Sequence, residues 1–295
     1  MKRYILFGLA LAILMGTGLA QNVEAGNAEA FRSTSEQKGP TVQDGLDWLK
    51  EKFGINNINT RIDTDTMDIW LALGADENGS TIEVRISVQQ TAEDWYSKGV
   101  ASDQQGKHDE ALQAFDRAIA INPQFALAWY KKGHTLFNQS KYDEAIQAYN
   151  KVIEIAPQHA EIWNDKGVVL NNQGKYDEAI QVLNKAIELD PQFALAWYNK
   201  GLALSNQGKY EEAIQAYNRA IEINPQDMDT WNNKGSALDS QGKYDEAIKA
   251  YNKALETNPQ YIEAWNNKGI ALRLLGRNTE ADAASAKARE LGIRG

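Results

Sequence analysis

The chain has 295 residues, with 31 Lys and Arg against 40 Asp and Glu, and a formal net charge of −9. This acidic balance argues against a nucleic-acid binder, which needs clustered Lys and Arg to hold the phosphate backbone. The absence of Cys excludes disulfides, thiolate catalysis, Cys-ligated zinc and iron–sulfur clusters. A single long uncharged apolar run also excludes a polytopic membrane protein.

The N-terminal segment has the order of a secretory signal. Lys2 and Arg3 precede an uncharged run over residues 4–20, and small-residue sites end at Ala20 and Ala25. This order predicts a signal peptide over residues 1–25, cleaved after Ala20 or Ala25, and a protein that is secreted or held at the cell surface. The alternative is that residues 4–20 remain as a membrane anchor and the rest of the chain faces outside. Membrane contact is expected only through such an uncleaved segment.

Residues 26–40 are small and polar and are interpreted as a linker. Residues 41–91 predict a small α+β unit, to which we assign no function. Its first part has apolar residues at helical spacing, namely Val42, Leu46, Leu49 and Phe53. Apolar residues then alternate over 69–73 and 82–88 on either side of a turn signal at 74–80, which predicts one β-hairpin after the helix.

From residue 92 the sequence repeats with a period of 34 residues. Each period contains a Trp, a Gly four residues later and an Ala sixteen residues later, and the first five also contain a Pro; the Trp positions are Trp95, Trp129, Trp163, Trp197, Trp231 and Trp265. The six units are 92–125, 126–159, 160–193, 194–227, 228–261 and 262–295. A 34-residue period is the signature of an array of helix–turn–helix units.

Each unit predicts two short helices that cannot bury an apolar face alone. In the fourth unit the helices are expected over 196–206 and 210–223, with a turn at Gly208 and a stop at Pro225. Gly201 and Ala213 let the two helices approach closely, and aromatic side chains fill the space to the next unit. Stability must therefore come from stacking, and the fold class is mainly α.

These residues resemble the tetratricopeptide repeat family, whose pattern places Trp, Leu, Gly, Tyr, Ala, Phe, Ala and Pro at fixed offsets. The resemblance implies a right-handed α-solenoid whose first helices line a concave groove that holds peptide segments. The chain departs from the pattern at the Leu position, which is Lys in all six units. We interpret this Lys as covering apolar surface with its stem, with a ligand-binding lysine ladder as the alternative. The sixth unit has a small, polar second helix, typical of a C-terminal cap.

The groove assignment suggested by the resemblance falls on Tyr, Asn and His side chains close after each Trp. Tyr offers stiff contact area with a polar tip, and Asn pairs with backbone amides. The alternative is that these residues simply suit exposed helix surface. Asn two residues after the Trp also resembles the asparagine ladder of the protein O-GlcNAc transferases, and favours the C-terminal half. The predicted groove residues are Tyr130, His134, Asn164, Tyr198, Asn199, Asn232, Asn233, Asn266 and Asn267.

No enzyme is predicted. His108, His134 and His159 occupy different repeat positions and form no metal-binding spacing, and no Gly-rich phosphate loop is present, so no cofactor is expected. The sequence predicts an exported protein–protein interaction scaffold that binds a protein or peptide ligand in its groove. The alternative is a structural or assembly component of the cell envelope that acts through self-association.

Overall fold

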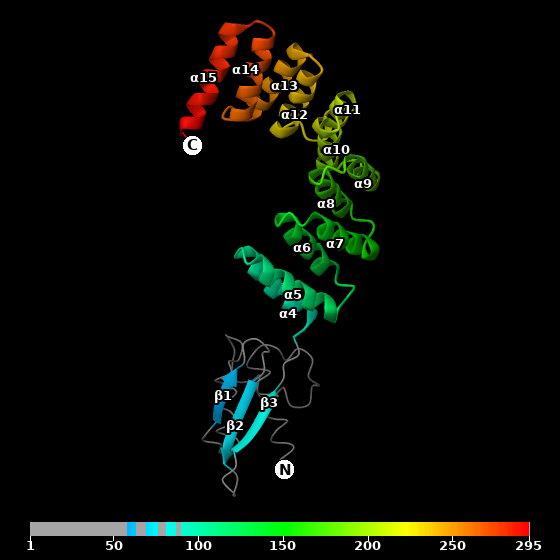
Figure 1. Cartoon of the computed structure of the whole chain (residues 1–295), viewed down its shortest axis with the longest axis vertical. Helices are drawn as coiled ribbons and strands as arrows, with labels where there is room; N and C mark the ends of the chain where they lie inside the picture. Colours follow the sequence, from blue (N-terminus) through cyan, green and yellow to red (C-terminus); the bar gives the residue numbers. More distant parts are fainter. Residues whose placement is uncertain (1–57, 63–68, 76–80, 87–89, 295) are drawn as a thin grey trace, which may run out of the picture. The chain divides into compact units, whose positions relative to one another are not determined.

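The computed structural model describes residues 58–62, 69–75, 81–86 and 90–294, which divide between two compact units, 1–90 and 91–295 (Figure 1). The predicted signal peptide or anchor, the linker at 26–40 and the helix expected near 42–53 all lie outside the described residues. In the described ranges, no helix combines the length and apolar character that crossing a bilayer requires.

The first unit contains a three-stranded antiparallel sheet in the order β1 (Ile58–Ile62), β2 (Ile69–Ala75), β3 (Thr81–Ile86). Strands β2 and β3 form the hairpin that the alternating pattern predicts, with Leu71 opposite Val84. Sequence reasoning missed β1, because the Asn-rich segment around it has low strand propensity. Its hydrogen-bonded partner β2 supplies the stabilisation that this local sequence lacks.

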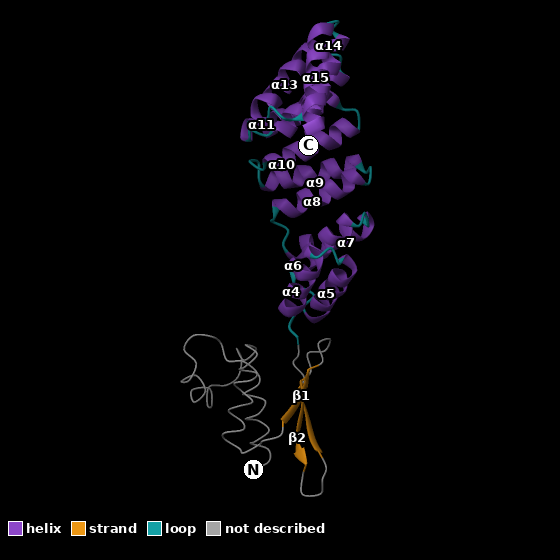
Figure 2. Cartoon of the chain, turned by 90° about the vertical axis from the view of Figure 1, so that its left-hand side faces the viewer, coloured by secondary structure: helices purple, strands orange, loops and turns teal. Residues whose placement is uncertain are grey.

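The second unit is six consecutive helix pairs, which we call repeats 1 to 6; the first helix of each is helix A and the second helix B (Figure 2). The A helices are α4 (Ala92–Gln104), α6 (Ala126–Asn138), α8 (Ala160–Asn172), α10 (Ala194–Asn206), α12 (Met228–Ser240) and α14 (Ile262–Leu274). The B helices are α5 (His108–Ile121), α7 (Tyr142–Ile155), α9 (Tyr176–Leu189), α11 (Tyr210–Ile223), α13 (Tyr244–Thr257) and α15 (Asn278–Arg294). The mainly α solenoid is confirmed, and α10 begins two residues before its predicted start.

The repeated Trp and the Pro before it are joined by a hydrogen bond that links one repeat to the next. In repeats 2 to 6 the indole Nε1 donates a hydrogen bond to the carbonyl of the Pro six residues earlier, at 2.9–3.1 Å. Pro ends the preceding helix B because it cannot donate to the helical ladder. The Trp then fastens that loop to the helix that follows, which fixes the angle between one repeat and the next.

The repeated Gly of helix A is the point of closest approach to helix B. A Cβ at Gly133 would lie 3.0 Å from the Tyr149 ring, and one at Gly167 would lie 2.6 Å from Leu183 Cγ. The side chains against these glycines in repeats 1 to 5 are among the largest fully buried groups in the described residues: Phe115, Tyr149, Leu183, Tyr217 and Tyr251. Each of these five repeats therefore has an aromatic or Leu side chain packed onto bare helix backbone.

The array bends toward its A helices. Each helix B packs on the next helix A, and consecutive A helices also contact one another, with α8 and α10 in the most extensive of these contacts. Consecutive B helices make no comparable contact in the described array. Figure 1 shows α6 and α8 on the inner side of the curve and α7 and α9 on the outer side. The concave surface thus belongs to the A helices.

The last helix, α15, has 17 residues where the other B helices have 14. Residue 293 is Ile where the earlier repeats have the Pro that ends helix B, so the helix continues to Arg294. Between residues 278 and 292, the side chains that it buries are those of Ala281, Ala284 and Ala288. The sequence-predicted cap is thus a long helix whose buried contacts are made by small side chains.

We expect the substitution Ser140→Gly to stabilise the array by about 0.5–1 kcal/mol. The A-to-B turn needs a left-handed residue, which is Gly in the other five repeats and Ser140 in repeat 2, with φ 58°. Gly adopts this conformation without Cβ strain. Urea unfolding followed by circular dichroism measures the change, and an unchanged or lower midpoint would contradict it.

Candidate functional site

The candidate site is the concave surface of the A helices. We call it the inner face and define it by three side chains of each repeat, those two residues before, one after and two after the repeated Trp. In repeat 4 these are Leu195, Tyr198 and Asn199, all on α10. Because α10 lies between α8 and α12, each such set faces the corresponding sets of the neighbouring repeats.

Hydrogen bonds join the inner face from one repeat to the next. The residue after the Trp in one repeat pairs with the residue two after the Trp in the following repeat, 35 positions on. Asn199 Nδ2 donates to Asn164 Oδ1 at 2.8 Å, and Asn267 Nδ2 donates to Asn232 Oδ1 at 3.1 Å. The other two pairs are Tyr130 Oη to Asp165 Oδ2 at 3.0 Å and Asn233 Nδ2 to Tyr198 Oη at 3.1 Å.

These pairs decide how accessible the predicted groove residues are. Asn164, Asn199 and Asn232 are buried between the A helices. Four others are half-buried and also take part in the pairs: Tyr130, Tyr198, Asn233 and Asn267. His134 and Asn266 are exposed. The structure thus brings seven of the nine predicted residues into one network between repeats, and the assignment of a peptide to this surface stays a prediction.

Sequence reasoning missed a group of side chains beside Tyr198. Tyr261 Oη donates to Asp229 Oδ1 at 2.7 Å, and Asn232 Nδ2 donates to Glu263 Oε1 at 3.2 Å. Asp229 and Glu263 stand two residues before their Trp, the one inner-face position that the groove assignment did not use. In repeats 1 to 4 this position holds Glu93, Leu127, Glu161 and Leu195. The alternation of apolar and acidic residues there was the sequence pattern that could have pointed to these side chains.

Burial and neighbouring carboxylates hold the inner-face tyrosines in the neutral form. Burial, followed by the charge of Asp165, raises the pKa of Tyr130 to about 12. Burial, followed by the charges of Asp229 and Asp227, raises the pKa of Tyr198 to about 12. Burial also raises the pKa of Asp165, against the lowering effect of the hydrogen bond from Tyr130. Both phenol groups therefore keep their proton at neutral pH, where the Tyr130 hydroxyl donates to Asp165 and the Tyr198 hydroxyl oxygen accepts from Asn233.

We expect Tyr130 to titrate near pH 12 in carbon-13 NMR of tyrosine-labelled protein, with Tyr130→Phe assigning its resonance. Asp165→Asn should lower this pKa but leave it above 10, because burial is the larger cause. A raised pKa keeps the proton on the folded chain, so this contribution to stability is complete below pH 10 and is lost as pH rises toward 12. A Tyr130 midpoint at pH 10 would contradict the packing described.

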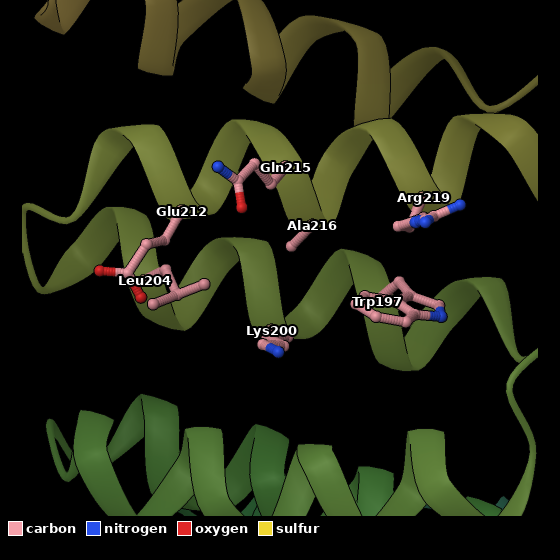
Figure 3. Close-up of a pocket in the computed structure, with 7 residues that line it drawn as sticks. All are labelled: Trp197, Lys200, Leu204, Glu212, Gln215, Ala216 and Arg219. Carbon is pink, nitrogen blue, oxygen red and sulfur yellow. The ribbon is translucent and has the colours of Figure 1, made fainter.

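The repeated Lys of helix A faces away from the inner face. Its Nζ lies 4.9–5.9 Å from the ring centroid of the Trp three residues earlier, in all six repeats. Figure 3 shows Lys200 and Trp197 on α10 lining a pocket of ≈ 310 Å³ with Glu212 and Arg219 of α11. Burial lowers the pKa of Lys200. The apolar surface that this Lys covers is thus the indole of its own repeat.

In the described part of the chain, no group of three or more His, Asp or Glu side chains is arranged to hold a metal ion. The polar atoms of the inner face are therefore hydrogen-bonding groups and uncoordinated carboxylates.

Family models described as tetratricopeptide or TPR repeats match residues 104–140, 130–192, 164–227, 229–261 and 250–283. A comparison with curated proteins found no match. Among solved structures, the crystal structure of MamA is 32% identical, with a TM-score of 0.52 over 55% of this chain and 95% of that chain.

Two less similar structures show the same fold. YrrB, described as a TPR protein with an unusual peptide-binding site, is 22% identical, with a TM-score of 0.50 over 59% of this chain and 89% of that chain. PilF of Pseudomonas aeruginosa is 18% identical, with a TM-score of 0.57 over 69% of this chain and 97% of that chain. The matched repeats, the stacked helix pairs and the MamA likeness together place this chain in the tetratricopeptide repeat family.

Proposed function

We propose that the chain is an exported scaffold that holds peptide segments of a partner protein against the inner face. Repeats of this family are protein-interaction modules, so the chain is an interaction scaffold and not an enzyme. The main observation in support of a peptide site is that large apolar side chains on the A helices are exposed. Leu127 is 54% exposed and Leu195 is 50% exposed, both at inner-face positions.

Exposed apolar side chains beside hydrogen-bonding groups suit an extended peptide. Leu195 lies three residues before Tyr198 and so on the same side of α10. The peptide's apolar side chains contact the exposed Leu, and its backbone pairs with the amides and hydroxyls that remain accessible. The peptide-binding site of YrrB supports the same kind of ligand here.

Selection of 12-residue random peptides against the full chain tests this proposal. We expect enriched peptides to lose at least about 10-fold in affinity to a Leu195→Ser variant, because one buried Leu contact contributes about 1.5–3 kcal/mol. Ile121→Ser is the matched control, since Ile121 is 52% exposed but lies on helix α5. Equal losses with both variants, or no enrichment at all, would contradict an inner-face site.

Export is the second part of the proposal and rests on the order of residues in the N-terminal segment. Expression of the full gene, followed by N-terminal sequencing of the product outside the cytoplasm, should give Gln21 or Gly26 as the first residue. Recovery of the uncut chain in the membrane fraction would support the anchor instead. Recovery only in the cytoplasm would contradict export.

One observation favours self-association as a second candidate function. Helix α14, in the last repeat, leaves Ile270 59% exposed and Leu274 58% exposed, beside a small hollow lined by Gly269 and Ser285. Sedimentation of the full chain across micromolar concentrations tests it. A concentration-dependent dimer that Ile270→Ser abolishes would support this candidate, and a monomer throughout would contradict it.

A further inference from the structure

Most charges of the A helices are divided between two sides; one exception is Lys131, a cation at an inner-face position of repeat 2, whose Nζ lies 6.0 Å from the centroid of the Tyr130 ring. All six lysines at the repeated position lie over the Trp of their own repeat. On that side a Glu of helix B lies near the Lys of helix A; burial lowers the pKa of that Lys, and the charge of the Glu partly offsets this. The pairs are Glu178 with Lys166, Glu212 with Lys200, and Glu280 with Lys268. Figure 3 shows this arrangement for Lys200 and Glu212. These lysines are therefore directed toward helix B and do not neutralise the inner face.

In the described array, one Glu of each B helix from α7 to α15 is paired with a cation, whereas four carboxylates of the inner face are not. Glu154, Glu188, Glu222, Glu256 and Glu290 each pair with a Lys or Arg three residues earlier, at 2.6–2.9 Å. On the inner face, Glu161, Asp165, Asp229 and Glu263 have no Lys or Arg within ion-pair distance among the described residues. Three of these four, Glu161, Asp229 and Glu263, lie in the first turn of their helix, where the helix dipole favours a negative charge.

Within the described helices, the clearest pair of carboxylates without a Lys or Arg partner is in repeats 5 and 6. Asp229 and Glu263 occupy the same position of adjacent A helices, and both charges act on Tyr198. Tyr261 and Asn232 each donate to one of these carboxylates, and the donors hold the side chains in place without cancelling their charge. Two fixed negative charges thus lie beside two tyrosines, with the exposed Leu195 in the preceding repeat.

We infer that this part of the inner face binds an extended segment that carries two basic side chains three residues apart, with an apolar side chain three residues outside the pair to contact Leu195. The inference deepens the proposed peptide site and rests on it. Adjacent packed helices lie about 8–10 Å apart. A chain in the polyproline II conformation advances about 3.1 Å per residue with three residues per turn, so side chains three residues apart lie on the same side, about 9 Å from one another. Lys or Arg at that spacing reaches both carboxylates and the faces of the tyrosines.

The test uses a fluorescein-labelled peptide, Gly-Leu-Gly-Ser-Lys-Gly-Ser-Lys-Gly-Ser-Leu-Gly, and two relatives in which both Lys are Gln or both are Glu. Fluorescence anisotropy with the full chain measures binding. We expect the Lys peptide to bind at least 10-fold more tightly than the Gln peptide, and the Glu peptide not to bind. Added salt should weaken the Lys peptide most, because its contacts are ionic.

The decisive variant is Asp229→Asn with Glu263→Gln, which keeps the oxygen atoms that accept from Tyr261 and Asn232. It should weaken the Lys peptide at least 10-fold. The matched control, Glu222→Gln with Glu256→Gln, makes the same change in net charge on the B helices and should weaken it less than twofold. Circular dichroism confirms that both variants remain folded.

Several outcomes would overturn the inference, and they are separable from failure of the proposed function. Equal binding of the Lys and Gln peptides would remove the preference for cations while leaving a peptide site. If both double variants weakened binding of the Lys peptide equally, the binding would depend on the net charge of the chain and not on these two carboxylates. Self-association that only the Asp229→Asn, Glu263→Gln variant abolishes would assign the surface to a second copy. Failure of the Lys peptide while library-selected peptides still bind would leave the proposed function intact.

Discussion

Tyr217→Ala should lower the free energy of unfolding by about 3–5 kcal/mol, the largest effect we expect of a single substitution. Tyr217 is fully buried in the core cluster of repeats 4 to 6 and packs on Gly201. Its ring also lies 6.2 Å from that of Tyr198, centroid to centroid. Removing it leaves a cavity between α10 and α11 that the two helices cannot close without breaking the stack on either side.

Tyr217→Phe is the matched control, because it keeps the ring and removes only the hydroxyl. That hydroxyl lies 3.3 Å from Ser205 Oγ, so its loss should cost about 1 kcal/mol. Urea unfolding followed by far-ultraviolet circular dichroism measures both variants. If Tyr217→Phe were as destabilising as Tyr217→Ala, the stability of repeat 4 would depend on the hydrogen bond and not on ring packing.

Gly201→Ala should destabilise the array by about 1–3 kcal/mol, even though Ala is the better helix former. A Cβ at this position would lie 2.6 Å from Tyr217 Cδ1, and the three heavy atoms nearest to it all belong to Tyr217. The ring is enclosed on every side, so it cannot move away. The overlap must instead push α10 and α11 apart, which weakens their contact along the whole repeat.

The sign of this effect should reverse when Tyr217 is absent. In a Tyr217→Ala background, Gly201→Ala adds a methyl group to vacant space and gains the helix propensity of Ala, about 1 kcal/mol. A double-mutant cycle over the four proteins measures the coupling between the two positions. If Gly201→Ala destabilised both backgrounds equally, the cause would lie in the helix backbone and not in the contact with Tyr217.

The candidate site could be predicted only in part. The residues after each Trp were assigned to the groove from the family resemblance, and the structure places them on the surface where the A helices meet. Their pairing was not predictable, because Asn199 and Asn164 are 35 residues apart and meet only when the repeats stack with one particular offset. The same offset brings Tyr261 to Asp229, a contact that no local pattern of residues indicates.

The sequence by itself determined the number of repeats, their boundaries and the helices within them. These features depend on contacts between residues close in the sequence: Gly against an aromatic or Leu side chain of the same repeat, Pro at the end of helix B, and Trp bonded to the Pro carbonyl six residues earlier. Only the tertiary structure decided which polar groups remain accessible. The curvature of the array turns one side of each helix A toward its neighbour, so Asn164 and Asn232 become buried while the carboxylates of Asp229 and Glu263 are left without a cation.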